Sequence, residues 1–150
     1  MARDRSVSRL FVVESTRHSV LTPRSVMQRV MDPSTWPSWQ PEIISTEGPE
    51  KLAEGDVVTG RARLLGFTVQ GTSLTTSADE KEFVEDVVVG VRMRVLYRVE
   101  ESEEGSLVTR RLEADMPTGF SGRILAVFLR RRLRRMQDRV LDALTGQAEV

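Results

Sequence analysis

The sequence contains no cysteine and a single histidine, His18. The absence of cysteine excludes disulfides, thiolate metal ligands and cysteine nucleophiles. One histidine cannot build a multi-histidine metal site, and a Ser-His-Asp triad would have to use His18. A histidine late in a strand is usually solvated or hydrogen-bonded, so we predict no metal site and no catalytic triad. Nothing in the sequence implies a cofactor.

Long hydrophobic runs are also missing. The longest, Ile124 to Leu129, is far shorter than the ~20 residues that cross a bilayer. Near the N-terminus only Leu10 to Val13 is apolar, which is too short for a signal peptide. Hydrophobic residues make up 39% and charged residues 29% of the 150-residue chain, a balance typical of soluble globular proteins. We therefore expect one cytoplasmic domain covering residues 1–150.

The chain has no net charge, because 22 basic residues balance 22 acidic ones. This balance argues against a surface that binds nucleic acid all round. Acidic clusters at residues 79–82 and 101–104 would repel a long phosphate track, so we expect no nucleic-acid partner. All but two of the basic residues are arginine.

Aromatic residues are scarce, at 5%, yet both tryptophans fall in the segment PSTWPSWQPEI, residues 33–43. Before it, Thr22 and Pro23 predict the start of a short helix that ends at Pro33. Ser34 is a candidate cap for a second, very short helix. One helical turn would present Trp36 and Trp39 on the same side. They either cap the core or line the opening of a binding site, and one indole can do each.

Strand patterns occupy most of the remaining chain. Residues 8–20 have strand composition, and from residue 57 onward several runs alternate between apolar and polar positions. One face of each run is apolar: Val58, Gly60, Ala62 and Leu64; Val91, Met93, Val95, Tyr97 and Val99; and Val108, Leu112, Ala114 and Met116, with Arg110 among them. Turn signals about every ten residues indicate an antiparallel meander.

From Gly119 the period returns to that of a helix, which Gly146 would end. Six apolar residues form one stripe on this helix: Leu125, Leu129, Leu133, Met136, Val140 and Leu144. The predicted order is one strand, two short helices, about six strands and one long helix.

This order resembles the START-like (SRPBCC, Bet v 1-like) superfamily, and within it bacterial polyketide cyclase/dehydrase-like and coenzyme-Q-binding-like proteins. The resemblance rests on TPRSVMQRVMDPSTWPSWQPEI after the first strand, LAEGDVV before the hairpins, YRVEE, and MPTGFSGRIL before the last helix. It implies an α+β helix-grip fold, in which a curved antiparallel sheet of about seven strands wraps around the C-terminal helix. It also implies an apolar small-molecule ligand in the hollow between sheet and helix.

Small inward residues and few aromatic residues independently favour such a hollow. We predict a set of ligand-binding residues from the two short helices, the strand faces and the last helix. These are Val26, Val30, Trp36, Trp39, Val58, Gly60, Ala62, Leu64, Met93, Val95, Tyr97, Arg110, Leu112, Leu125 and Leu129. The leading hypothesis is binding or transfer of a lipid, quinone or polyketide-like molecule.

The rival hypothesis is a polyketide cyclase or dehydratase acting in the same hollow. Acid–base chemistry needs a positioned proton donor or acceptor, and Tyr97, Arg110 and Glu85 are the inward candidates. A register shift of one residue would instead exchange Arg110 with Arg111. Two or more convergent polar groups would favour the enzyme, whereas a uniformly apolar lining would favour the binder.

The run LRRRLRR in the last helix is either a solvated outer face or a basic surface for anionic lipid. Just before it, Phe120, Ile124 and Val127 also lie opposite the core stripe. A weaker hypothesis is therefore peripheral membrane contact through Phe120, Ile124, Arg130, Arg131 and Arg134. Covering loops or a homodimer partner would explain the same exposed apolar residues.

Overall fold

The computed structural model describes residues 10–116 and 120–146, with the side chains of residues 120–122 outside the description. Eleven elements follow one another: β1 (Leu10–Ser19), α2 (Pro23–Val30), η1 (Pro33–Thr35), α3 (Trp36–Trp39), β2 (Ile43–Glu47), β3 (Val57–Leu64), β4 (Phe67–Ala78), β5 (Glu82–Val88), β6 (Arg92–Ser102), β7 (Gly105–Asp115) and α4 (Phe120–Leu144). The predicted order of one strand, two short helical segments, six strands and a long helix is confirmed.

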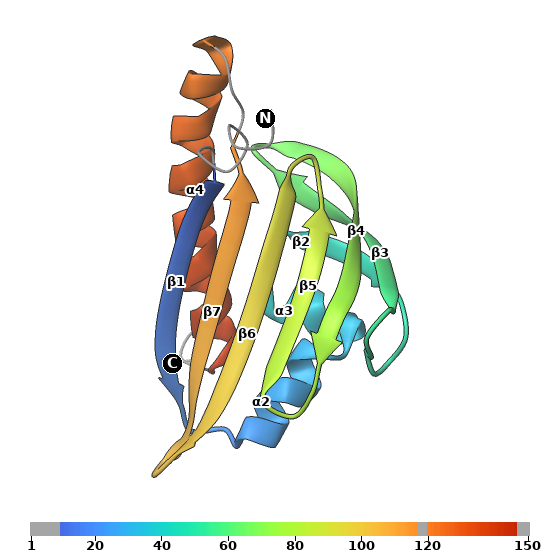
Figure 1. The fold of residues 1–150 in the computed structure, drawn as a ribbon, viewed down its shortest axis with the longest axis vertical. Coiled ribbons are helices and arrows are strands. Elements are labelled where there is room, and N and C mark those ends of the chain that lie inside the picture. Colours follow the sequence, from blue (N-terminus) through green and yellow to red (C-terminus); the bar gives the residue numbers. More distant parts are fainter. Residues whose placement is uncertain (1–9, 117–119, 147–150) are drawn as a thin grey trace, which may run out of the picture.

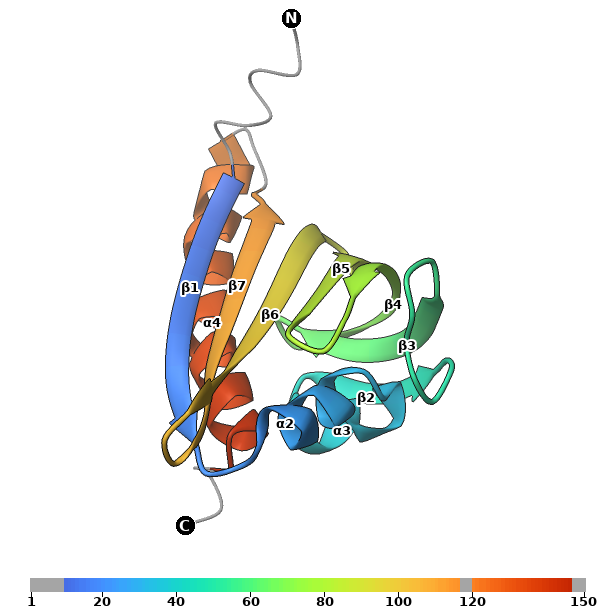
Figure 2. The same cartoon turned by 60° about the horizontal axis from the view of Figure 1, so that its bottom comes forward.

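The seven strands form one antiparallel sheet in the order β1-β7-β6-β5-β4-β3-β2. The first strand crosses to the last one, so that Leu10 pairs with Asp115 and Ser19 with Ser106. Figure 1 shows α4 along the β1–β7 side of this sheet. Figure 2 shows β6 to β3 curling away from that side, with α2 and α3 across one end of the curl. The arrangement is the helix-grip fold.

The short helices begin at side-chain caps. Thr22 Oγ1 accepts a hydrogen bond from Ser25 N at 3.2 Å, as the sequence predicts. The second helical segment is capped differently from the prediction. Asp32, not Ser34, is its N-cap, and Asp32 Oδ1 accepts from Ser34 N at 3.0 Å. The cap falls at Asp32 because a 3₁₀ turn begins at Pro33, two residues before the start that a Ser34 cap implies.

From Leu129 to Leu144, one side of α4 packs in the core, whereas most of the apolar residues before Leu129 are exposed. Leu129, Leu133, Val140 and Leu144 are buried, as the stripe predicts. Leu125 is 43% exposed, so its predicted inward position is wrong. The reason is visible in Figure 1, where the first turns of α4 project beyond the end of β1 and have no sheet to pack against.

The strand faces follow the alternation in the sequence. In β6, Val95, Tyr97 and Val99 are buried while Arg94 and Arg98 are exposed. In β7, Val108, Leu112 and Ala114 are buried together with Arg110, which is 2% exposed. The neighbouring Arg111 pairs with Glu14 and Glu113 on the outer face. The alternative register, with Arg111 inside, is therefore wrong.

Candidate functional site

A cavity of about 110 Å³ lies between the curled half of the sheet and the helices α3 and α4. A single buried water needs roughly 10–15 Å³, so this space has room for a larger guest. Most of its lining surface is apolar, and it is partly open to solvent. Strands β2 to β6 supply most of the wall, with Trp36 of α3 and Met136 of α4 opposite.

The predicted ligand-binding residues divide into two groups by their position. Eight of them line the cavity: Trp36, Val58, Gly60, Ala62, Leu64, Met93, Val95 and Arg110. The other seven lie outside the lining: Val26, Val30, Trp39, Tyr97, Leu112, Leu125 and Leu129. All of the second group except Leu125 are core residues. They fill the space under β1, β7 and α2 because α4 packs closely on that half of the sheet.

Gly60 has a second role beyond its small size. A Cβ atom at this position would collide with the backbone oxygen of Ser45 on the neighbouring strand. The two strands approach this closely where the register of β2 shifts between Ile43 and Ser45, a β-bulge. A glycine is therefore needed here by the backbone as well as by the cavity.

The lining of the cavity includes a buried arginine with two side-chain hydrogen-bond partners. Arg110 Nε donates to Tyr97 Oη at 3.0 Å, and Arg110 Nη1 donates to Gln137 Oε1 at 2.6 Å. Gln137 Nε2 returns a hydrogen bond to the backbone oxygen of Arg110 at 2.6 Å. The guanidinium also stacks over the Tyr97 ring, 5.3 Å from its centroid. These contacts hold the Arg110 side chain in one position where it borders the cavity.

Glu85 is a second buried charged residue of the lining, and it is 4% exposed. Ser73 Oγ donates to Glu85 Oε1 at 2.5 Å. Burial raises the pKa of the Glu85 carboxyl, while the Ser73 hydrogen bond and the charge of Arg110 oppose that rise. Among the described residues no ion pair joins Glu85 to Arg110. The cavity thus contains a carboxyl group that is easier to protonate than usual.

Both tryptophans are buried. Trp36 Nε1 donates to the backbone oxygen of Val30 at 2.9 Å, and its ring borders the cavity. Trp39 Nε1 donates to Thr35 Oγ1 at 3.0 Å, and its ring meets Tyr97 edge-on at 5.9 Å between centroids. Trp39 therefore packs in the core, whereas Trp36, which is also buried, borders the cavity.

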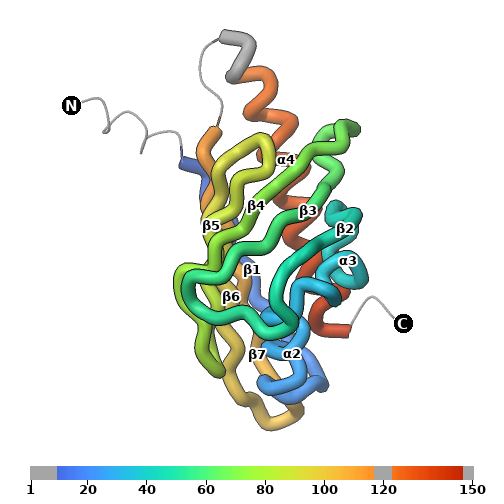
Figure 3. Tube along the Cα trace, turned by 90° about the vertical axis from the view of Figure 1, so that its right-hand side faces the viewer, coloured from blue at the N-terminus to red at the C-terminus, as the bar shows by residue number. Residues whose placement is uncertain are grey.

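An ion pair connects the rim of the cavity to α4. Glu42, in the connection between α3 and β2, lines the cavity and is mostly buried. Its Oε2 atom accepts from Arg132 Nη2 at 2.9 Å, and Oε1 lies 3.9 Å from Arg139 Nη1. Figure 3 shows α3 and β2 beside α4, where this contact forms.

The polar residues of this site that were not predicted include Ser73 and Glu42 of the lining, and Gln137, which holds Arg110. Gln137 could have been found, since it follows Leu133 by four residues and precedes Leu141 by four on the buried face of α4. Ser73 lies in β4, whose alternation is weak. Glu42 lies between two elements, where periodicity gives no orientation. His18 is exposed on β1, opposite Leu107, and does not line the cavity.

Within the described ranges, residues 10–116 and 120–146, no cluster of side chains could hold a metal ion. None of the helices in this part of the chain has the length and apolar character needed to cross a membrane.

Comparison with known families agrees with this geometry. Residues 11–149 match the family described as polyketide cyclase / dehydrase and lipid transport. The chain belongs to this family. Membership implies a function on an apolar small molecule, either binding or cyclase-type chemistry. No curated protein sequence matches the chain.

Several solved structures share the fold at low sequence identity. The ZhuI aromatase/cyclase from Streptomyces sp. R1128 is 15% identical with a TM-score of 0.80, over 93% of this chain and 94% of that one. A START superfamily protein from Mycobacterium smegmatis is 13% identical with a TM-score of 0.73, over 92% and 97%. The di-domain aromatase/cyclase StfQ of the steffimycin pathway is 13% identical with a TM-score of 0.77. The alignment covers 98% of this chain but only 53% of StfQ.

Proposed function

We propose that this family member binds a small molecule with an apolar body and an oxygen-bearing end. The observation that carries the proposal is the apolar cavity whose lining includes the buried charged residues Glu85 and Arg110. Apolar contact would contribute ~25 cal/mol per Å² of buried surface. A ligand carbonyl or hydroxyl can accept from Arg110 or exchange a hydrogen bond with Glu85, which fixes the direction of binding.

Filling the cavity tests the proposal. Ala62 lines the cavity on β3, and Ala62→Phe would place a ring in the open space. Displacing about 60 Å² of apolar contact removes roughly 1.5 kcal/mol, or about tenfold in affinity. We expect the purified protein to bind a neutral apolar fluorescent dye such as N-phenyl-1-naphthylamine, and the Ala62→Phe variant to bind it about tenfold more weakly.

The matched control is Ala53→Phe, because Ala53 is exposed in the β2–β3 connection and does not line the cavity. This variant should bind the dye as the unsubstituted protein does. Equal binding by all three proteins, or no uptake of any apolar dye or lipid extract, would contradict the proposal.

A second candidate function, polyketide cyclase or dehydratase activity, is favoured by the convergence of Glu85, Ser73 and Arg110 in one cavity. A carboxyl group with a raised pKa can donate a proton near neutral pH. In a dehydration, Glu85 would protonate the departing hydroxyl, which leaves as water. The C–H bond at the neighbouring α-carbon would break, its electron pair would form the new C=C bond, and its proton would pass to solvent water at the open side of the cavity. Arg110 would bind the substrate carbonyl oxygen, which makes that α-proton more acidic.

The substitution Glu85→Gln separates this candidate from simple binding. Glutamine keeps the shape of the side chain but has no acidic proton to transfer. If the protein is a dehydratase or cyclase, Glu85→Gln should lower turnover of a poly-β-ketone substrate by about 10²–10⁴-fold while dye binding changes little. The unsubstituted enzyme should also lose activity as pH rises through the raised pKa of Glu85, since only the protonated form donates. Unchanged turnover in the variant would remove Glu85 from the chemistry.

A further inference from the structure

The beginning of α4 exposes a group of apolar side chains to solvent. Ile124, Leu125, Val127 and Phe128 are 55%, 43%, 54% and 58% exposed. Ala126 and Leu129 on the other side of the helix are buried. Figure 1 shows this part of α4 extending past the end of β1. Four neighbouring apolar residues on a projecting helix end are more than the scattered exposure of ordinary surfaces. We call them the apolar tip.

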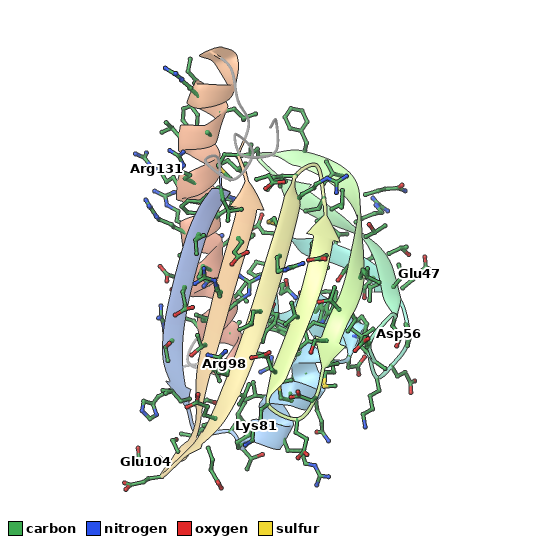
Figure 4. The ribbon with its side chains drawn as sticks, in the orientation of Figure 1. Glu47, Asp56, Lys81, Arg98, Glu104 and Arg131 are labelled. Atoms are coloured by element: carbon green, nitrogen blue, oxygen red, sulfur yellow. The ribbon has the colours of Figure 1, made fainter. Side chains whose placement is uncertain are left out.

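Arginines lie on both sides of the apolar tip along the same helix, with Arg123 before it and the others after it. Five of them are exposed: Arg123, Arg130, Arg131, Arg134 and Arg135. Residues 120–137 contain no aspartate or glutamate. The acidic residues of α4, Asp138 and Asp142, lie further along and pair with Arg17 of β1. The five exposed arginines form none of the salt bridges among the described residues, and Figure 4 shows Arg131 pointing away from the sheet.

The spacing between the apolar tip and the arginines matches the depth of a lipid interface. Arg131 follows Ile124 by seven residues and Arg135 follows Phe128 by seven, so each pair lies on one face of the helix. Seven residues rise by about 10 Å along a helix. Amphipathic segments bury their apolar side chains roughly 5–10 Å into the boundary between headgroups and acyl chains. With the tip at that depth, the four arginines that follow it would stand at the level of the lipid phosphates.

We propose that the apolar tip and the exposed arginines of α4 form a docking surface for an anionic lipid bilayer. The protein would insert the tip obliquely, without spanning the membrane, and the arginines would bind headgroup phosphates. This inference goes beyond binding in the cavity. It rests on the exposed apolar and basic side chains that occur together at one end of α4.

The charge on this surface argues against a second copy of the chain as its partner. A two-fold symmetric dimer would place the same patch against itself. Five arginines from each copy would then face one another with no acid among residues 120–137 to neutralise them. An anionic bilayer supplies the opposite charge and attracts each arginine near the surface.

Flotation with lipid vesicles tests the proposal on the full chain. We expect binding to phosphatidylcholine vesicles that contain 30% phosphatidylglycerol, much weaker binding to pure phosphatidylcholine, and release by about 0.5 M NaCl. The variants Arg131→Glu/Arg135→Glu and Ile124→Ser/Phe128→Ser should each reduce partitioning by about tenfold or more. Both pairs are exposed, so their thermal unfolding should be unchanged.

Two matched controls change the same residue types elsewhere. Arg24→Glu/Arg92→Glu alters exposed arginines outside α4, and Val20→Ser/Val57→Ser alters exposed valines away from the tip. Both should retain vesicle binding. Equal partitioning to neutral and anionic vesicles, or binding to neither, would overturn the proposal. So would a dimer in light scattering that Ile124→Ser/Phe128→Ser converts to monomer, because the tip would then be a protein interface.

Discussion

A buried arginine is stable only when its N–H groups find acceptors and its charge is compensated. Arg110 finds acceptors for its N–H groups in Tyr97 and Gln137. The Tyr97 ring, which lies under the guanidinium, compensates part of its charge. Alternation in β7 was enough to predict that Arg110 points inward. Its partner Gln137 comes from α4, and no pattern along one strand reveals a partner on another element. The sequence therefore predicts the buried charge but not the network that holds it.

Tyr97 offers a direct measurement of this environment, because it is the single tyrosine of the chain. Burial raises the pKa of Tyr97 to about 12, although Arg110 opposes the shift. We expect the 295 nm absorbance of the folded protein to rise only near pH 12, whereas urea-unfolded protein should titrate near 10. The phenol keeps its proton longer in the folded state, so its contribution to stability is complete below about pH 10 and is lost as pH rises toward 12. A folded-state transition near pH 10 would mean that Tyr97 is exposed.

At the scale of elements, composition and periodicity predicted the order of strands and helices, and the Thr22 cap predicted where α2 begins. The details that depend on neighbouring strands were not predictable. The bulge in β2 arises where Gly60 of β3 admits the backbone of Ser45, a contact between segments separated by a loop. From the sequence, Gly60 was only a small residue in an alternating strand.

Replacing Gly60 tests this close approach. In Gly60→Ala the new methyl group would meet the Ser45 backbone oxygen, and backbone cannot rotate away as a side chain can. We expect a loss of about 1–3 kcal/mol in the free energy of unfolding, measured by urea denaturation. Thr59→Ala is the control, since Thr59 is exposed on the same strand and its side chain should matter little. Equal stability of the two variants would show that β2 can shift outward freely.

At the scale of the whole molecule, α4 covers only one side of the curved sheet. It packs against β1 and β7, and the remaining strands curl over open space that α2 and α3 close at one end. The resemblance to known families predicted this outcome. Residue patterns alone could not, because whether facing apolar side chains fill a hollow depends on how far the sheet bends. The prediction that Leu125 points inward was wrong for a similar reason. How far α4 extends past the end of β1 is a property of the assembled fold and cannot be seen in the sequence pattern.

Folding kinetics should reflect this topology. The first strand pairs with the last, and the remaining strands assemble between them. Because such distant segments must meet before the sheet is complete, we expect refolding in roughly milliseconds to seconds in stopped-flow tryptophan fluorescence. Each of the variants Trp36→Phe and Trp39→Phe leaves a single tryptophan as the fluorescent probe. If folding is two-state, the two variants should refold at the same rate. A microsecond phase that accounts for the whole signal would contradict this expectation.

The positions of the two indoles give the protein a built-in optical reporter. Trp36 borders the cavity, whereas Trp39 is shielded against the Tyr97 ring. In a Trp39→Phe background, emission would come from Trp36 alone and would shift when a guest displaces water beside its ring. Occupancy of the cavity can thus be followed without any label, which makes unlabelled candidate ligands directly comparable.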